Sequence, residues 1–339
     1  MNKIVRLAVL SILVVAMLGM AVGASAEGYK IGFAQSYNGN SYRQTQEAQM
    51  AIVAEELKAS GEISEYTVAE ANQDVATQIQ QIQDFAMQGY DLIIVDPGSA
   101  SSLNDCIQEV CDMGIPVFDI NDGPITMDHE NLYHMAFDNV DMMYALTKYV
   151  CEQMGGAGNL IELRGTAGVA VEDEFHSGVL KALEEYPDVK IVAEIYTDWT
   201  ASKAQTELNS ILPTLDKVDG LVTQGGDAYA AVQAFLSAGY TADTLPVIAG
   251  DNRGSFLNWW GNEAPEGYKT LSAASNPWIG AFSLYVAVDL LDGNEVSNDL
   301  IIPFGQVDAD MLPDYLGLGN DDVAFTAYSR EEVKALEIQ

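Results

Sequence analysis

Short apolar runs that alternate with helical stretches constrain the fold of this chain more than any other feature. Runs such as residues 92–95 and 220–223 are apolar at consecutive positions, which predicts strands that are buried on both faces. Strands of this kind, separated by helices of about 10 to 15 residues, form parallel sheets with helices on both sides. The sequence therefore predicts an α/β fold with doubly wound parallel sheets.

The predicted elements follow one another along most of the chain. The further strands are predicted at residues 29–35, 66–71, 117–120, 132–137, 160–163, 191–196, 247–249 and 270–274, and helices at 41–58, 76–87 and 103–113 among others. Ser41 is a candidate cap for the first of these helices.

An internal repeat predicts two similar halves. Residues 90–119 and 218–251 both run through a strand, a polar loop and a helix to a second strand, and each half continues into a second polar loop, at residues 121–123 and 251–253. The interval from Asp91 to Pro116 is 25 positions, and the interval from Asp219 to Pro246 is 27. Because open α/β sheets bind ligands at the carboxyl ends of their strands, two such lobes facing each other would enclose a ligand cleft.

The loops at the predicted strand ends are rich in carboxylates, amides and aromatic rings. They are residues 35–43, 96–97, 121–123, 172–175, 198–199, 226–227, 251–253 and 275–278. Carboxylates accept hydrogen bonds from hydroxyl groups, Arg and Asn donate them, and flat rings cover the apolar face of a sugar. Each residue alone is equally typical of a turn or a helix cap. Their convergence on equivalent strand ends favours a neutral, polyhydroxylated ligand.

Several other classes of function find no support in the sequence. A formal charge of −35 disfavours nucleic acid as a partner, since that binding needs clustered Lys and Arg. The chain has three His and no G-x-S-x-G, H-E-x-x-H, paired C-x-x-C or G-x-x-x-x-G-K-[ST] motif. His176 is interpreted as a surface helical residue, and the three cysteines as buried apolar residues without a disulfide. We expect neither a metal nor a cofactor.

The N-terminus has the pattern of a secretory signal peptide. Lys3 and Arg6 precede an apolar run over residues 7–22, which ends in the small residues 24–26. The run is shorter than the roughly 20 residues that a spanning helix needs. We therefore expect cleavage after Ala26, export to the periplasm or the extracellular space, and no stable membrane insertion.

The order and spacing of the strand-end motifs resemble the type I periplasmic binding proteins of sugar ABC transporters, in their ribose-binding branch. The resemblance covers about residues 28–305. The stretches that carry it are 31–33 through 40–42, 88–91 with 96–97, 114–117, 138–139, 161–168 and 198–199. It implies two lobes joined by a hinge of three crossings, near residues 136–138, 274–276 and 302–305, that closes around a ligand.

The resemblance also implies a set of ligand-binding residues. Those expected from the first lobe are Asn40, Tyr42, Arg43, Asp96, Asn121 and Asp122, and those from the second lobe and the hinge are Glu172, Phe175, Trp199, Asp227, Asp251 and Asn276. Trp199 takes the place of an aromatic that stacks on the sugar.

Two departures from the family pattern each remove a guanidinium. Asn121-Asp122 stands where the family has an Asp-Arg pair, and Phe175 stands three residues before Gly178 where it has an Arg. Arg43 is a candidate replacement for the lost donors. We therefore expect a ligand other than ribose held in the usual way.

The resemblance predicts the following organisation and role. Residues 1–26 form the signal, 27–137 with about 276–303 the first lobe, and 138–275 with about 304–339 the second, including a short helix over residues 329–336. The implied function is a monomeric, non-enzymatic receptor that delivers a monosaccharide or polyol to an ABC transporter permease. A receptor for a chemotaxis or sensor system and a secreted sugar-processing enzyme are the alternatives.

Overall fold

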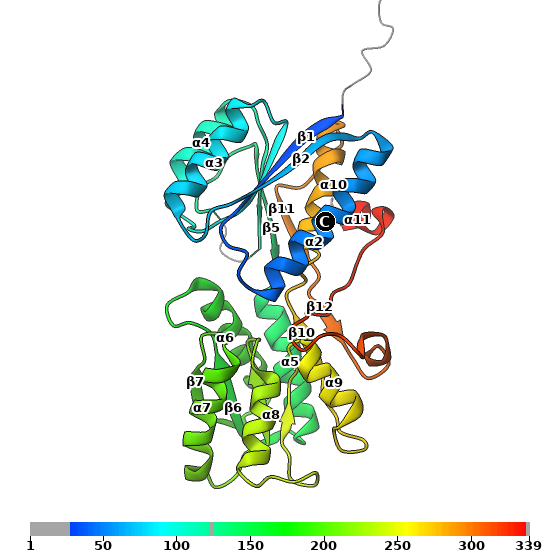
Figure 1. Ribbon diagram of the computed structural model, residues 1–339. Helices are drawn as coiled ribbons and strands as arrows, with labels where there is room; N and C mark the ends of the chain where they lie inside the picture. The colour runs from blue at the N-terminus through cyan, green and yellow to red at the C-terminus, as the bar shows by residue number, and fades with distance from the viewer. Residues whose placement is uncertain (1–27, 122–124, 337–339) are drawn as a thin grey trace, which may run out of the picture.

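The computed structural model describes residues 28–121 and 125–336, which form two lobes stacked end to end (Figure 1). The predicted signal peptide, residues 1–26, and the predicted ligand residue Asp122 lie outside the described residues. Within the described ranges, no helix combines the length and the hydropathy needed to cross a bilayer.

The first lobe is built on a six-stranded parallel sheet. Its strands, in spatial order, are β11 (Asp299–Ile302), β5 (Leu132–Phe137), β4 (Val117–Ile120), β3 (Leu92–Asp96), β1 (Tyr29–Gln35) and β2 (Ile63–Glu70). Its helices are α2 (Ser41–Ser60), α3 (Val75–Met87), α4 (Asn104–Asp112), α10 (Ile279–Leu291) and α11 (Arg330–Leu336).

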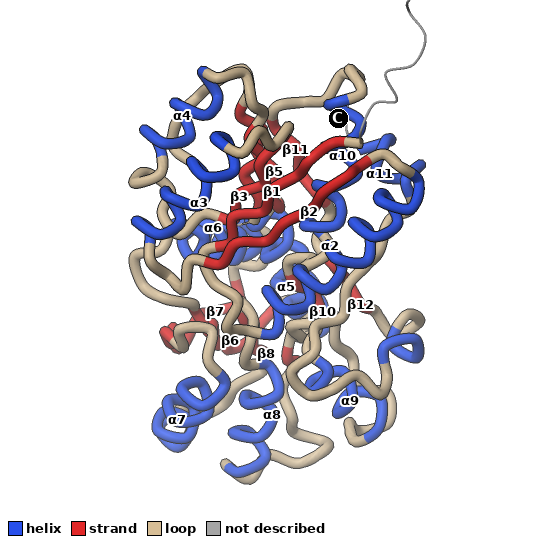
Figure 2. Tube along the Cα trace, turned by 45° about the horizontal axis from the view of Figure 1, so that its top comes forward, coloured by secondary structure: helices blue, strands red, loops and turns tan. Residues whose placement is uncertain are grey.

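Alternate residues of each central strand pack into different cores. Phe33 and Ile94 face the core formed with α2 and α10, whereas Ala34 and Val95 face the core formed with α3 and α4. Figure 2 shows these two helical layers on opposite sides of the sheet. This arrangement explains why the strands are apolar at consecutive positions.

The second lobe repeats this plan with four parallel strands. They are, in spatial order, β7 (Asp188–Tyr196), β6 (Ala157–Arg164), β8 (Gly220–Thr223) and β9 (Val247–Ile248). The helices α5 (Asn139–Gln153) and α6 (Ala170–Leu183) cover one face, and α7 (Ala201–Ile211), α8 (Ala228–Ser237) and α9 (Gly254–Asn262) cover the other.

Between the lobes, a two-stranded antiparallel ribbon forms part of the hinge. It pairs β10 (Ser272–Ala274) with β12 (Gly305–Val307). The chain also passes from β5 in the first sheet to α5 in the second lobe, and Asp138 caps that helix by accepting from the Asp141 amide at 2.8 Å.

The end of the chain makes a further passage between the lobes. After β12, the 3₁₀ turn η2 (Leu312–Tyr315) packs on the second-lobe core, and the chain then returns to the first lobe, where Val333 of α11 is completely buried (Figure 1). The prediction that residues up to 339 belong to the second lobe is therefore wrong for α11. Its buried residue Val333 packs in the first-lobe core together with residues of α10, such as Phe282 and Tyr285.

The predicted strands begin and end within three residues of the observed ones. The predicted cap of the first helix is wrong by one residue: Asn40 is the cap, and its side chain accepts from the Arg43 amide at 2.9 Å. Cys106, Cys111 and Cys151 are buried and free, as predicted.

Candidate functional site

A cavity of about 410 Å³ lies between the lobes, at the carboxyl ends of the strands of both sheets. Its lining comes from both lobes and from the hinge. The lining residues are Asn40, Tyr42, Arg43, Asn121, Met142, Val169, Val171, Phe175, Trp199, Gln224, Gly225, Gly226, Asp251, Arg253, Ala274, Ser275 and Val323.

The first-lobe wall is a polar network. The Arg43 guanidinium forms an ion pair with Asp96, the last residue of strand β3. Asp96 is 1% exposed. Asn121 Nδ2 donates to Asp96 Oδ2 at 2.9 Å and to Gln46 Oε1 at 2.9 Å. Tyr42 Oη donates to Asn121 Oδ1 at 2.9 Å. The network fixes the orientation of the donors that face the cavity.

Local sequence explains how these side chains reach the cavity. Because Asn40 caps α2, Tyr42 and Arg43 lie in the first turn of that helix, directly at the edge of the sheet. Asn121 follows β4 with a φ of +75°, a left-handed conformation that Asn adopts more readily than most residues. The chain therefore turns sharply at Asn121, whose side-chain amide donates to Asp96.

The second-lobe wall is mostly apolar. Phe175, Val171 and Met142 reach the cavity from α6 and α5, and Trp199 reaches it from the loop after β7. Trp199 has a φ of +53°, and a Cβ placed on Gly165 would lie 2.2 Å from its ring. The indole therefore lies directly against the Gly165 backbone, half-buried at the cavity wall.

Two carboxylates lie at the ends of β8 and β9. Asp227 accepts from Thr197 Oγ1 at 2.6 Å and also from Thr223 Oγ1, and burial raises the pKa of this carboxyl to about 7. Asp251 accepts from the Ala228 amide at 3.1 Å and lines the cavity. Asp227 is 2% exposed and does not line it.

Glu172 also lies behind the cavity wall. Its carboxylate accepts from Arg164 Nε at 2.6 Å and Nη2 at 3.1 Å, and from Gln224 Nε2 at 3.1 Å. Gln224 in turn lines the cavity and accepts from the Gly165 amide at 2.7 Å. Arg164 and Glu172 therefore position Gln224 rather than face the cavity.

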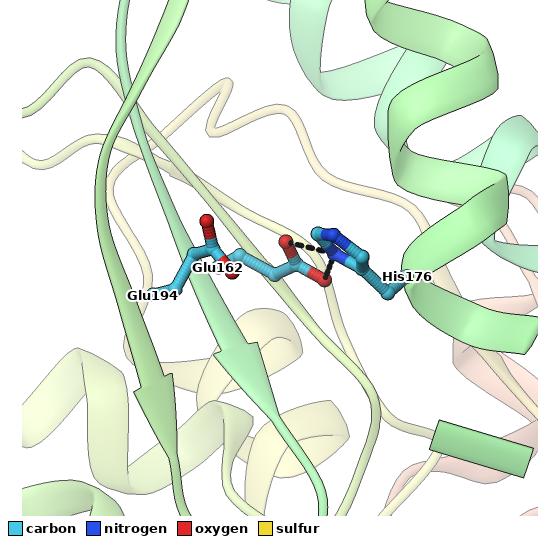
Figure 3. Close-up of side chains that lie close together, drawn as sticks. All are labelled: Glu162, His176 and Glu194. Atoms are coloured by element: carbon cyan, nitrogen blue, oxygen red, sulfur yellow. Dashed lines mark hydrogen bonds and ion pairs between the residues drawn. The ribbon is translucent and has the colours of Figure 1, made fainter. Parts of the chain in front are cut away.

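A neighbouring cluster joins β6, α6 and β7. Figure 3 shows the carboxylate of Glu162 directed at the His176 ring, with Nδ1 at 2.9 and 3.0 Å from its two oxygens, and Glu194 beyond it. The potential ligand atoms of these three residues lie within 4.8 Å of one another. Arg164 Nη1 donates to Glu194 at 2.6 Å.

This cluster is best described as an ion-pair network. The Arg164 guanidinium already supplies positive charge to Glu194, and imidazole satisfies the buried Glu162 carboxylate, whose pKa burial raises. A metal cation bound between Glu162, His176 and Glu194 would lie beside the Arg164 guanidinium, and repulsion between the two positive charges opposes its binding. His176 is half-buried and paired, so its interpretation as a surface residue is wrong.

The predicted residues divide into three groups. Those that line the cavity are Asn40, Tyr42, Arg43, Asn121, Phe175, Trp199 and Asp251, and those placed behind it are Asp96, Glu172 and Asp227. Asn276 lies in the hinge, where it is completely buried and donates to the Thr326 carbonyl at 2.8 Å.

Arg253 and Gln224 line the cavity although sequence reasoning did not select them. Both follow predicted strands of the second lobe, and Arg253 was among the strand-end loop residues. Its position depends on a contact with residues 320–324, far along the chain, that no local pattern shows.

A larger hollow of about 660 Å³ lies elsewhere, at the opposite ends of β8 and β9. All its lining residues belong to the second lobe, among them Leu212, Tyr240 and Leu245. It lacks the convergence of two sheets that marks the cavity between the lobes.

Comparison with known proteins identifies relatives. Residues 31–295 match the family described as periplasmic binding protein domain. The chain is 28% identical to the xylitol-binding protein of Mycolicibacterium smegmatis, over 79% of this chain and 72% of that protein. It is 27% identical to the galactofuranose-binding protein of Escherichia coli, over 61% of this chain and 63% of that protein.

Among solved structures, the fold is similar to an ABC transporter solute-binding protein from Thermobispora bispora. The TM-score is 0.76 at 29% identity, with 91% of this chain and 95% of that chain covered.

Proposed function

Because the chain belongs to the periplasmic binding protein domain family, we propose that it captures a monosaccharide or a related polyol in the cleft between its lobes and delivers it to an ABC transporter permease. The observation that carries the proposal is the cavity of about 410 Å³ formed by both lobes. This volume lies near the lower end of the range for small-molecule sites and suits a ligand of about the size of one sugar.

The chemistry of the two walls supports a neutral polyhydroxylated ligand. The first-lobe wall offers Arg43 as a donor, and the Tyr42 hydroxyl and Asn121 Oδ1 as acceptors, which match hydroxyl groups. The second-lobe wall offers Trp199 and Phe175, which match the apolar face of a sugar ring. Arg43 is paired with Asp96, so it presents donors without a net local charge.

The relatives support the same class of ligand. The chain resembles proteins named for binding xylitol and galactofuranose. We infer in addition that the protein is exported through the predicted N-terminal signal, works as a monomer, and binds its ligand without converting it.

A thermal-shift screen of pentoses, hexoses and polyols, including xylitol, D-ribose, D-allose and myo-inositol, tests the proposal. A ligand present at a hundred times its Kd stabilises the folded state by about 2.7 kcal/mol. For a chain of this size, that corresponds to an increase in Tm of about 4 °C. We expect such an increase with at least one of these compounds, and recovery of that compound unchanged after incubation.

Amino acids and short peptides serve as controls in the same screen. An increase in Tm with one of these, and with no carbohydrate or polyol, would contradict the proposed ligand class. Appearance of a product would contradict a role in binding alone.

A further inference from the structure

The C-terminal strap, defined here as residues 308–336, extends beyond the part of the chain that matches the family, which ends at residue 295. Figure 1 shows it beside α9 in the second lobe and then running past the hinge to α11 on the first lobe. It is therefore connected to both walls of the cleft.

The strap pairs with the loop that carries Arg253. The amides of Gly254 and Ser255 donate to the carbonyls of Asp322 and Asn320 at 2.8 and 3.0 Å. The Ala324 amide donates to Asn252 O at 2.8 Å. These backbone bonds, together with an antiparallel bridge at Arg253, hold both ends of the loop over residues 252–255.

The approach between the two segments is very close. A Cβ placed on Gly254 would lie 2.1 Å from the carbonyl oxygen of Gly319, so no larger residue fits at position 254 without displacing the strap. The strap therefore fixes the position of the loop at the start of α9. It thereby also fixes the backbone position from which the Arg253 side chain extends.

Arg253 reaches from the second lobe to the first. Its Nη1 donates to Ser41 Oγ at 3.2 Å, at the start of α2, and lies 3.5 Å from the Asp321 carbonyl in the strap. A guanidinium has five N–H donors, and both contacts use Nη1. Among residues 28–121 and 125–336, neither Nε nor Nη2 has a hydrogen-bond partner, so both can donate to a ligand in the cavity that Arg253 and Val323 line.

The far end of the strap is firmly attached to the first lobe. Val333 is completely buried in the first-lobe core. Arg330 forms ion pairs with Glu62 at 2.8 Å and Asp289 at 3.0 Å, and its guanidinium lies 5.4 Å from the centre of the Tyr285 ring.

The free length between the two attachments is short. Ala324 is bound to the second lobe and Arg330 to the first, and the intervening chain is tied to the hinge where Asn276 donates to Thr326 O. The segment 324–330 spans six intervals, which extend to about 20 Å at most. Separation of the lobes is therefore limited while both ends stay bound.

We propose that the C-terminal strap is a fourth connection between the lobes that holds Arg253 at the ligand site, and that Arg253 binds the ligand while contacting both lobes. The part that concerns the ligand rests on the proposed function. The part that concerns the lobes does not, because the strap contacts join residues of the chain to one another.

The first test detaches the strap with Val333→Asp in the mature full-length chain, with Glu331→Ala on the exposed face of the same helix as control. Without ligand, we expect Val333→Asp to increase the radius of gyration and to speed hydrogen exchange at the Gly254 and Ser255 amides at least tenfold. We expect the Glu331→Ala control to have the radius of gyration and the hydrogen-exchange rates of the parent protein. If Val333→Asp does not fold, Arg330→Ala, which removes the two ion pairs, replaces it.

The second test compares Arg253→Lys and Arg253→Ala with the parent, using the compound that gives the largest increase in Tm in the screen. We expect both variants to raise Kd at least tenfold, with hydrogen exchange at Gly254 and Ser255 unchanged, because the backbone pairing does not need the guanidinium. Exchange and scattering that stay at parental values after strap detachment would overturn the strap's role. Parental Kd in both Arg253 variants would overturn the role of Arg253.

The two proposals fail in different ways. If no carbohydrate or polyol binds the parent protein, the proposed function and the ligand role of Arg253 both fail, whereas scattering and exchange still decide whether the strap ties the lobes. If a ligand binds the parent and the detached variant equally well, with unchanged exchange, the strap proposal alone fails.

Discussion

The two walls of the cleft differ in chemistry although the lobes repeat the same fold. The first-lobe wall is a hydrogen-bonded network in which Arg43, Asp96 and Asn121 fix one another. The second-lobe wall is formed mainly by Trp199 and Phe175, with Gln224 held from behind. The difference indicates a division of roles, in which the first lobe contributes polar groups and the second contributes the aromatic rings together with the polar groups of Asp251 and Arg253.

The buried carboxyl of Asp227 gives the largest effect that we expect, on stability. Its folded pKa of about 7 lies above the unfolded value, so its ionisation opposes folding as pH rises from about 4 to above 7. The free energy of unfolding should therefore fall over that range by up to about 4 kcal/mol from this group. Urea unfolding of the parent and Asp227→Asn at pH 5 and pH 8 measures the contribution.

The Asp227→Asn variant should show a smaller fall in stability between the two pH values. Asp251 and Arg253 also act on this carboxyl, with opposite sign, so Asp251→Asn is the matched comparison. Equal pH dependence in the parent and Asp227→Asn would show that the carboxyl does not titrate as described.

Trp199→Ala tests the apolar wall. We expect a loss of about 2 to 4 kcal/mol in ligand binding, as for a buried anchoring aromatic, measured by isothermal titration calorimetry. Tyr240→Ala, which removes a half-buried ring at the opposite end of the second lobe, serves as control and should bind like the parent. Unchanged affinity in Trp199→Ala, accompanied by a lower Tm, would assign the ring a packing role instead.

Arg43→Lys tests the polar wall. Lys keeps the charge that faces Asp96 but loses the planar set of donors. We expect affinity to fall at least about tenfold, or 1.4 kcal/mol. Parental binding in both Arg43→Lys and Arg43→Ala would mean that the guanidinium does not bind the ligand.

Tyr42→Phe gives the smallest expected effect. It removes the hydroxyl that donates to Asn121 Oδ1 at 2.9 Å and keeps the ring. Because the net contribution of one neutral hydrogen bond is about 0.5 to 1.5 kcal/mol, we expect up to about a tenfold rise in Kd. A larger loss than that of Trp199→Ala would contradict the expectation that the aromatic ring contributes more to binding than this hydroxyl.

The sequence predicted those features that depend on local pattern. The strand Gly220–Thr223 was predicted with correct bounds because all four of its residues are buried, which leaves a short run without a charged side chain. The carboxyl ends of the predicted strands at residues 29–35 and 191–196 then indicated the segments from which Tyr42, Arg43 and Trp199 line the cavity.

Features that depend on distant pairing could not be predicted in this way. The amphipathic pattern of α11 predicts that one face is buried, but not which lobe it packs against. The helix was predicted to belong to the second lobe, whereas it packs on the first. The place of Arg253 depends on residues 320–324, and the pairing of His176 with Glu162 depends on how α6 packs on β6. Neither contact leaves a periodic pattern in the chain.

We expect the two walls of the cleft to close on one ligand molecule. Small-angle X-ray scattering of the mature protein, with and without a saturating amount of the best compound from the screen, tests it most directly. We predict a smaller radius of gyration with the ligand bound, since both walls must approach the same molecule. An unchanged radius of gyration at saturation would contradict capture of the ligand by closure of the two lobes.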